Sequence, residues 1–306
     1  MNLFRVLSAA ALAVLLPTLL LPGPALAWSR FAHEVVGELA EADLSPPARM
    51  AVQDLLEGES LAAVGSWADQ VRPDRAETAP LHYVNGPLDV LVPLQADFDL
   101  PQGNVYSAVL GYAEILADVE QPRAQRTEAL KFLVHFLADL HQPLHSGFAE
   151  DRGANDVPVV YRGEVINLHR YWDHQIFAEV QARFDSREFA AVLGARHGDH
   201  ERRAWAAIGP REWVVEARQL IFSGLYPRAR RDALQQVPAT EIPDGVAGPI
   251  AVLDGSYRLV WQPVAELQLA RAGARLAAAL NVIFESGQSP FEPPPIAFPP
   301  APLPER

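Results

Sequence analysis

The sequence predicts a mainly α-helical protein with one domain and a small β-hairpin. With 306 residues, of which 49% are hydrophobic, the chain is long enough to bury a large core. Its apolar residues recur at helical spacing in long segments that are joined by short loops, which favours a bundle-like arrangement. Cysteine is absent, so a disulfide framework is excluded. We therefore expect one helical domain over residues 28–286.

The first 27 residues have the features of a secretory signal peptide. Arg5 provides a positive start, Val6–Leu21 an apolar region, and Ala25–Ala27 a small-x-small cleavage site. The alternative is a retained membrane anchor, but three prolines and a glycine interrupt the apolar run. We expect cleavage between Ala27 and Trp28 and a secreted or periplasmic protein. Cleavage would give Trp28 a free amine that could chelate a metal together with its own carbonyl oxygen.

The first part of the mature chain is predicted to form three helices and an extended segment. The helices are expected over about His33–Leu44, Ser45–Leu56 and Ser60–Arg72. Ser45 precedes two prolines, and a hydroxyl before proline in the first turn is typical of a capped helix start. Ala79–Pro87 is predicted to be extended, with His82 and Tyr83 on opposite sides. An irregular loop is expected over Leu88–Gly103.

The rest of the chain is predicted to contain further helices, a hairpin and a tail. Helices are expected over about Asn104–Val119, Arg123–His141, Ser186–Leu193, Pro210–Phe222 and Gly255–Phe284. Val157–Tyr161 and Glu164–Asn167 are predicted to pair as a hairpin that turns at Arg162 and Gly163. Residues 287–306 are rich in proline and are predicted to be an extended or disordered tail.

The predicted central helix carries polar groups that an apolar core does not need. Three histidines and an aspartate lie in the apolar run Lys131–His145, and burying such groups without partners costs several kcal/mol. His135 and Asp139 are four residues apart and share one helix face, so both could bind one metal ion. Pro143 ends the helix and directs His145 toward a second position. His141 lies on another face and is expected to be structural. A set of satisfied core histidines is the alternative.

The same spacing recurs farther along the chain. His169 and Asp173 repeat the His-x-x-x-Asp pattern at the start of another predicted helix. Two such pairs on separate helices favour a site with several metal ions. The candidate ligand groups are too many for one tetrahedral ion and suit three ions. They are Trp28, His33, Asp69, His82, His135, Asp139, His145, His169 and Asp173.

The charge of the chain argues against a broad basic surface. The net charge is −13, whereas most nucleic-acid-binding proteins neutralise phosphates with lysine and arginine. Lys131 is the single lysine. Cationic contacts to a phosphate would therefore have to come from arginine or from metal.

The candidate ligands and their order resemble a known family. The chain is similar to the secreted, single-strand-specific nucleases and 3'-nucleotidases with three zinc ions, whose fold is shared with bacterial zinc-dependent phospholipase C. The resemblance rests on five motifs: Trp28–His33, Ser66–Asp69, Leu81–Tyr83, His135–His145 and Asn167–Asp173.

The resemblance implies a division of the ligands among three zinc ions. One zinc would be held by Asp69, His82, His135 and Asp139. A second would be held by Trp28, His33 and the bridging Asp139, and the third by His145, His169 and Asp173.

The resemblance also implies hydrolysis of single-stranded DNA or RNA. A zinc-bound hydroxide would attack phosphorus while the third zinc stabilises the leaving 3'-oxygen, which leaves a 5'-phosphate product. Three Zn²⁺ and three ligand carboxylates would give a local charge of about +3, which answers the objection from net charge. Flexible single strands could enter such a cleft more easily than a stiff duplex.

Two asparagines are candidates for further roles. Many eukaryotic relatives have aspartate where this chain has Asn85, and they also have disulfides. An amide cannot act as a general base, so Asn85 is either a catalytic residue of another kind or a hydrogen-bonding residue beside the ligands. By the same resemblance Asn155 either contacts the scissile phosphate or only shapes a turn.

Two other functions remain as alternatives. A phospholipase C would use the same three-zinc arrangement, but no amphipathic or basic membrane-binding helix is evident. A secreted zinc-binding protein without catalysis would need saturated or exchangeable ligand shells, whereas the predicted sites have open positions. We expect a monomer without stable membrane association after processing.

Overall fold

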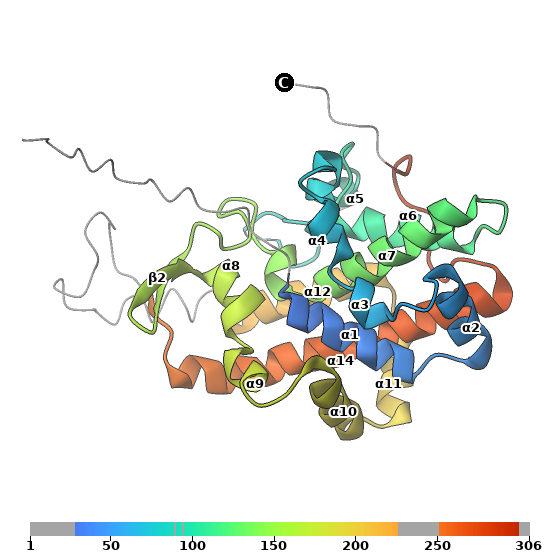
Figure 1. The fold of residues 1–306 in the computed structure, drawn as a ribbon. Helices are drawn as coiled ribbons and strands as arrows, with labels where there is room; N and C mark the ends of the chain where they lie inside the picture. Colours follow the sequence, from blue (N-terminus) through green and yellow to red (C-terminus); the bar gives the residue numbers. More distant parts are fainter. Residues whose placement is uncertain (1–27, 89, 94, 226–250, 300–306) are drawn as a thin grey trace, which may run out of the picture.

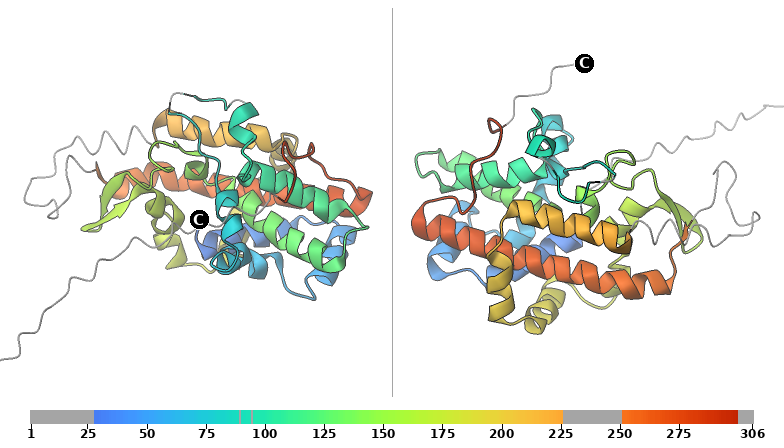
Figure 2. Two further views of the ribbon diagram at one scale, coloured as in Figure 1. Left: turned by 90° about the horizontal axis from the view of Figure 1, so that it is seen from above. Right: turned by 180° about the vertical axis from the view of Figure 1, so that it is seen from behind.

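The computed structural model describes residues 28–88, 90–93, 95–225 and 251–299 (Figure 1). Within these residues, helix α7 (Arg123–Asp139) packs against α6 (Val105–Ala117) and against the long helix α14 (Gly255–Ser286). Helix α1 (Arg30–Ala42) packs against α14 over much of its length (Figures 1 and 2). The prediction of a mainly α-helical fold is confirmed. The predicted signal peptide lies outside the described residues.

The first two helices begin differently from each other. In α1 the Ser29 hydroxyl accepts a hydrogen bond from the backbone N–H of Ala32, so this helix begins three residues before His33. Helix α2 (Pro46–Leu55) begins after Ser45 as predicted, but the Ser45 hydroxyl makes no capping hydrogen bond. Instead, the backbone N–H of Ser45 donates to Asn281 Oδ1 in α14, at 2.8 Å.

The predicted helix over Ser60–Arg72 is broken in two. Helices α3 (Leu61–Val64) and α4 (Trp67–Val71) are separated at Gly65 and Ser66. A Cβ atom at Gly65 would lie 3.0 Å from the carbonyl oxygen of His33 in α1. The Gly65 carbonyl accepts a hydrogen bond from His135 Nδ1 in α7 at 2.8 Å. The break therefore allows three segments to meet at one point, which local sequence spacing cannot show.

The predicted extended segment Ala79–Pro87 is only half correct. Residues Ala76–His82 form the 3₁₀ helix η1, and extended backbone begins at Tyr83. His82 is buried and Tyr83 is 45% exposed, so the two neighbouring side chains differ in their exposure to solvent. The segment after η1 runs beside residues 145–149, with the Val84 N–H donating to the carbonyl of His145 at 2.7 Å. The following loop contains the short helix α5 (Gln95–Phe98).

Helix α6 starts within one residue of its predicted start. Asn104 and Ser107 form the capping box at this end of the helix.

The central helix ends two residues earlier than predicted. Helix α7 ends at Asp139, and the chain then forms the 3₁₀ helix η2 (Pro143–Ser146). His141 thus lies in the turn between α7 and η2.

The predicted hairpin is present and carries a third strand. Strands β1 (Pro158–Tyr161) and β2 (Glu164–Asn167) are antiparallel, with Val159 opposite Ile166. Both turn residues, Arg162 and Gly163, have positive φ, as a tight hairpin turn requires. Strand β3 (Ala251–Val252) pairs in parallel with β1. A strand of two residues gives no periodic signal, so the sequence did not predict it.

The second half of the chain is mostly helical. After β2 the described elements are α8 (Leu168–Arg170), the π-helix η3 (Tyr171–Gln175), α9 (Ala178–Gln181), α10 (Ser186–Arg196), α11 (Asp199–Ala206), α12 (Pro210–Leu220), the π-helix η4 (Ile221–Leu225), β3 and α14. Helices α9 and α11 were not predicted because α9 is only four residues long and α11 has no buried residue. None of the helices in the described part of the chain has both the length and the hydrophobicity needed to span a membrane.

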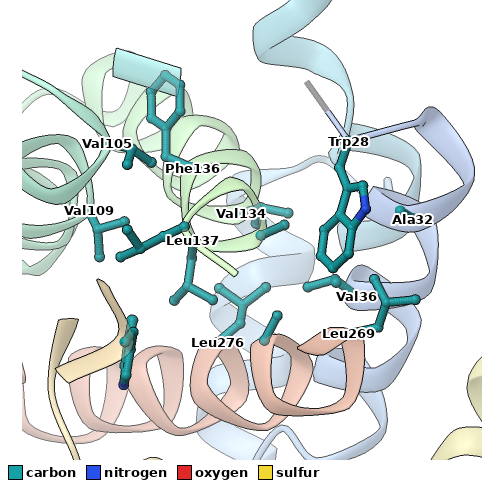
Figure 3. Packing of buried hydrophobic residues seen from close by; sticks show 14 of the residues in the cluster. Trp28, Ala32, Val36, Val105, Val109, Val134, Phe136, Leu137, Leu269 and Leu276 are labelled. Atoms are coloured by element: carbon teal, nitrogen blue, oxygen red, sulfur yellow. The ribbon is translucent and has the colours of Figure 1, made fainter. Parts of the chain in front are cut away.

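The core lies between α1, α7 and α14. Figure 3 shows Trp28, Val36 and Leu269 beside Val134 and Leu137, and all five side chains are almost completely buried. Trp28, the residue at the predicted cleavage site, is therefore part of the core.

The described part of the predicted tail packs on the domain. Phe298 lies edge-on to Tyr112 of α6, with ring centroids 4.8 Å apart, and Phe291 lies against Trp213 of α12. Phe291 and Phe298 are partly buried and pack against the core, so residues 287–299 of the predicted extended or disordered tail contact the domain.

Candidate metal centre

Eight side chains from distant segments meet at one place in the fold. His33 comes from α1, Asp69 from α4, His82 from η1, and both His135 and Asp139 from α7. His145 comes from η2, His169 from α8 and Asp173 from η3. Trp28 lies two residues before the start of α1, and the N–H of the next residue, Ser29, donates to the carbonyl of Asp173 at 2.9 Å. The structure thus brings together all nine residues that the sequence analysis proposed as ligands.

Asp139 lies between several histidines, and its side chain is completely buried. Its Oδ2 atom is 3.0 Å from both His135 Nε2 and His82 Nδ1. Its Oδ1 atom is 3.5 Å from His33 Nε2 and 3.4 Å from His145 Nδ1. The two oxygens therefore face different groups of histidines, as expected for a carboxylate that bridges two metal ions.

Three groups of side chains have the geometry of metal sites, and two of them share His135. In each group one ligand atom per residue lies within 4.8 Å of the others. The groups are Asp69 with His82 and His135, His33 with His135 and Asp139, and His145 with His169 and Asp173. In the third group Asp173 Oδ2 lies 3.2 Å from His169 Nε2, and Asp173 Oδ1 lies 3.7 Å from His145 Nε2.

Backbone carbonyls orient two of the histidines. His135 Nδ1 donates to the carbonyl of Gly65 at 2.8 Å, and His169 Nδ1 donates to that of Gly153 at 2.6 Å. A proton held on Nδ1 leaves Nε2 free to bind a metal. Gly153 has φ of +65°, and a Cβ atom there would lie 2.5 Å from the Leu144 carbonyl oxygen. Only glycine therefore fits where the His169 ring is fixed.

The buried carboxylates and histidines of this centre shift one another's pKa values. Burial raises the pKa of Asp139, but His135 and His145 outweigh it and hold this pKa well below its ordinary value. Burial lowers the pKa of His135, but Asp139 and Asp69 outweigh it and raise the pKa to about 9. In contrast, burial lowers the pKa values of His33 and His82. The buried carboxylates thus retain a proton on His135, in a place that a metal ion could take.

Several buried polar atoms in the centre have no hydrogen-bond partner. Buried nitrogen and oxygen atoms are normally satisfied, and a cluster of exceptions indicates a missing partner. The unpartnered atoms here include both ring nitrogens of His33, Asp69 Oδ1, His82 Nε2, Asp139 Oδ1 and His145 Nδ1. Together with the mixture of imidazole and carboxylate donors, they fit a site for several metal ions.

A cavity of about 570 Å³ opens over this centre. His82, His145 and His169 contribute to its wall. Asn85 and Asn155 also line it, so both asparagines proposed from the sequence lie at the site. Asn85 Oδ1 is buried without a partner, whereas Asn155 Nδ2 donates to the carbonyl of Arg152 at 2.9 Å. In this structure Asn155 therefore shapes a turn at the edge of the cavity.

Two arginines in or near the site were not predicted from the sequence. Arg72 lines the cavity, and its Nη1 atom lies 3.9 Å from Oδ1 of Asp69, which is three residues earlier in the chain. Its spacing from Asp69 could have indicated it. Arg218 of α12 is buried, and its guanidinium donates to the carbonyls of Ser146 and Gly147 at 3.0 Å and to that of Pro87 at 2.6 Å. Nothing in the local sequence distinguishes it from a surface arginine.

Comparison with known proteins identifies the family. The model of the S1/P1 nuclease family matches residues 28–285, which include every residue of the centre. The chain belongs to the S1/P1 nuclease family. Nuclease S1 from Aspergillus oryzae is 30% identical over 271 residues, which cover 84% of this chain and 91% of that protein. Nuclease P1 from Penicillium citrinum is 30% identical over 277 residues, covering 85% and 98%. Endonuclease 2 from Arabidopsis thaliana is 29% identical over 270 residues, covering 84% and 90%.

Membership of the S1/P1 nuclease family confirms the family that the sequence motifs predict. It also confirms the enzyme class, a hydrolytic nuclease. The His and Asp groups of this S1/P1 nuclease could bind metal ions.

Proposed function

We propose that this S1/P1 nuclease is an extracytoplasmic, zinc-dependent phosphodiesterase. It hydrolyses single-stranded DNA and RNA to 5'-phosphate products and also removes 3'-phosphates from nucleotides. The observation that carries this proposal is the position of Asp139, whose two oxygens face different histidine groups beneath an open cavity.

The proposed ligands divide among three zinc ions. Asp69, His82, His135 and Asp139 hold one, and His145, His169 and Asp173 hold another. The third is held by His33, Asp139 and the amine and carbonyl of Trp28. Bound zinc supplies Lewis-acid activation of water and neutralises negative charge that develops on the phosphate.

The residues around the cavity position the substrate. Arg72 presents a guanidinium beside Asp69, where it can donate to a phosphate oxygen. Asn85 also lines the cavity, so its side-chain amide is placed to contact the substrate. The ring of Tyr83 lines the same cavity and is partly exposed, so an unstacked base can pack against it. A double helix cannot offer an unstacked base, which favours single strands.

Secretion is supported by the predicted signal peptide and by the place of Trp28. Removal of residues 1–27 would create a free amine on Trp28, just before α1 and next to Ser29, whose N–H donates to the carbonyl of Asp173. We propose that this cleavage completes one of the zinc sites.

A substrate panel tests the proposal. Correctly processed protein is stripped with a chelator, reloaded with zinc and assayed on single-stranded DNA, RNA, a 3'-nucleotide and phosphatidylcholine. We expect zinc-dependent cleavage of the nucleic acids and of the nucleotide. Cleavage of the lipid alone would favour a phospholipase C, and zinc binding without any cleavage would favour a zinc-storage role.

A further inference from the structure

Gln142 connects two ligand-bearing segments of the centre. Its side chain is completely buried in the turn between α7 and η2. Its Nε2 atom donates to Asp173 Oδ1 at 2.8 Å, and its Oε1 atom accepts from the backbone N–H of Leu144 at 2.6 Å. One amide therefore contacts the carboxylate of η3 and the backbone beside His145 in η2.

Both halves of the amide are used in a way that favours metal binding. The hydrogen bond to Oδ1 limits rotation of the Asp173 carboxylate and keeps Oδ2 directed at His169, 3.2 Å away. The bond from Leu144 fixes the first turn of η2, which carries His145. A neutral amide suits this position, because it donates to one group and accepts from the other.

The backbone around Gln142 is braced by the long helix α14. Gln268 Nε2 donates to the His141 carbonyl at 3.2 Å, and Arg275 Nη1 donates to His141 Nε2 at 2.8 Å. The other ring nitrogen, His141 Nδ1, donates to the Leu137 carbonyl at 2.7 Å. His141 therefore anchors the turn to α14 and has no nitrogen left for a metal, as its place off the ligand face predicts.

We propose that Gln142 is a positioning residue for the metal site formed by His145, His169 and Asp173. This inference depends on the proposed function, because it requires that these three residues bind an ion. Loss of the hydrogen bond to Asp173 would weaken the binding of that ion and leave the other two sites intact.

Two variants and one control test this role. Gln142→Glu keeps an oxygen that can accept from Leu144 but, when ionised at pH 8, cannot donate to Asp173. Gln142→Met removes both hydrogen bonds at similar volume. Gln268→Met is the control, because Gln268 is a buried glutamine in the same region that donates to a backbone carbonyl rather than to a ligand.

The readout is zinc affinity, measured by competition with chelators of graded strength, together with the unfolding midpoint of the metal-free protein. In both Gln142 variants we expect one of three ions to bind about 10- to 100-fold more weakly. The other two ions should bind as in the unchanged protein, and Gln268→Met should retain all three. Substitution with Co²⁺ should alter the absorption spectrum of only one site in the Gln142 variants.

Three results would overturn the inference. The first is unchanged or tighter binding of all three ions in both Gln142 variants. The second is equally weakened zinc binding at all three sites. The third is an unfolding midpoint that falls much further in the Gln142 variants than in Gln268→Met. The second and third results would indicate a general structural role for Gln142. Failure of the unchanged protein to bind three ions would instead refute the proposed function.

Discussion

At the scale of single residues, spacing along a helix revealed the centre of the site. His135 and Asp139 are four residues apart, and the structure places His135 Nε2 at 3.0 Å from Asp139 Oδ2. The same relation holds for His169 and Asp173, at 3.2 Å. A separation of four residues determines which helix face a side chain occupies, so these two contacts could be predicted from the sequence.

Asp139→Asn tests the proposed bridge between two metal ions. An amide offers one oxygen and no negative charge, so it cannot serve two ions at once. We expect the variant to lose more than one zinc ion per chain. Its activity should fall by more than 100-fold, because loss of a hydrogen bond to a ligand alone lowers metal affinity or activity about 10- to 100-fold. Zinc analysis and a nuclease assay measure both effects.

His141→Ala is the comparison for that substitution. His141 is equally buried and lies two residues away, but its ring nitrogens contact Arg275 and the Leu137 carbonyl. We expect the variant to lose stability and to keep its zinc. Equal loss of zinc in the two variants would contradict the assignment of ligands.

Other residues of the site could not be predicted because their partners are far away in the chain. Gln142 contacts Asp173, and Arg218 contacts the backbone of Ser146 and Gly147. In the sequence Gln142 looks like an ordinary residue at a helix end, and Arg218 looks like a polar residue of an amphipathic helix. Their roles depend on how distant segments pack.

At the scale of secondary structure, long periodic segments were predictable and short or broken ones were not. Helices α6, α7 and α14 occur within a few residues of the predicted bounds. The break at Gly65 depends on contacts with α1 and α7, and strand β3 depends on its pairing with β1. Tertiary contacts override local preference at such positions.

Arg218→Met tests how α12 stabilises the segment that follows His145. The guanidinium donates to the carbonyls of Ser146 and Gly147, which follow His145, and to the carbonyl of Pro87. Removing it leaves these acceptors unpaired, which costs about 3 kcal/mol or more. Arg211→Met on the same helix is the control. Arg211 donates to Gln95 Oε1 at the surface and lies over the ring of Phe98, so its substitution should cost about 1 kcal/mol or less. Urea unfolding of the zinc-loaded proteins measures both values, and similar losses would refute the role of Arg218.

Gly111→Ala tests the docking of the C-terminal segment on α6. A Cβ atom at Gly111 would overlap the ring of Phe298, and such overpacking costs about 1 to 3 kcal/mol. In a Phe298→Ala background the ring is absent, so the same substitution should be neutral or stabilising by up to about 1 kcal/mol, because alanine favours the helix more than glycine does. A double-mutant cycle on the free energy of unfolding measures this coupling. Equal effects of Gly111→Ala in both backgrounds would show that the contact is not formed.

At the scale of the whole molecule, the site is assembled from segments that span residues 28–173. Spacing predicted which residues lie on one helix face, but it could not show that these segments meet. That expectation came from the resemblance to a known family, which the match over residues 28–285 supports. The acidic chain has no need of a broad basic surface if metal ions attract the phosphate.

Extra residues before Trp28 test the role of chain processing. If the amine of Trp28 is a ligand, an extension converts it to an amide that binds zinc poorly. We expect protein with a short N-terminal extension to hold one zinc ion much more weakly than correctly processed protein, with the remaining two retained. Metal analysis of both forms after identical dialysis makes the comparison. Equal zinc content in the two forms would contradict the role of the amine.

The most direct test of the metal centre is to locate the ions in crystals of the processed protein by anomalous scattering at the zinc absorption edge. The prediction for this experiment is three peaks, two of them flanking the carboxylate of Asp139 and the third beside Asp173. A crystal grown with zinc that shows no peak at these residues, or only peaks elsewhere, would contradict it.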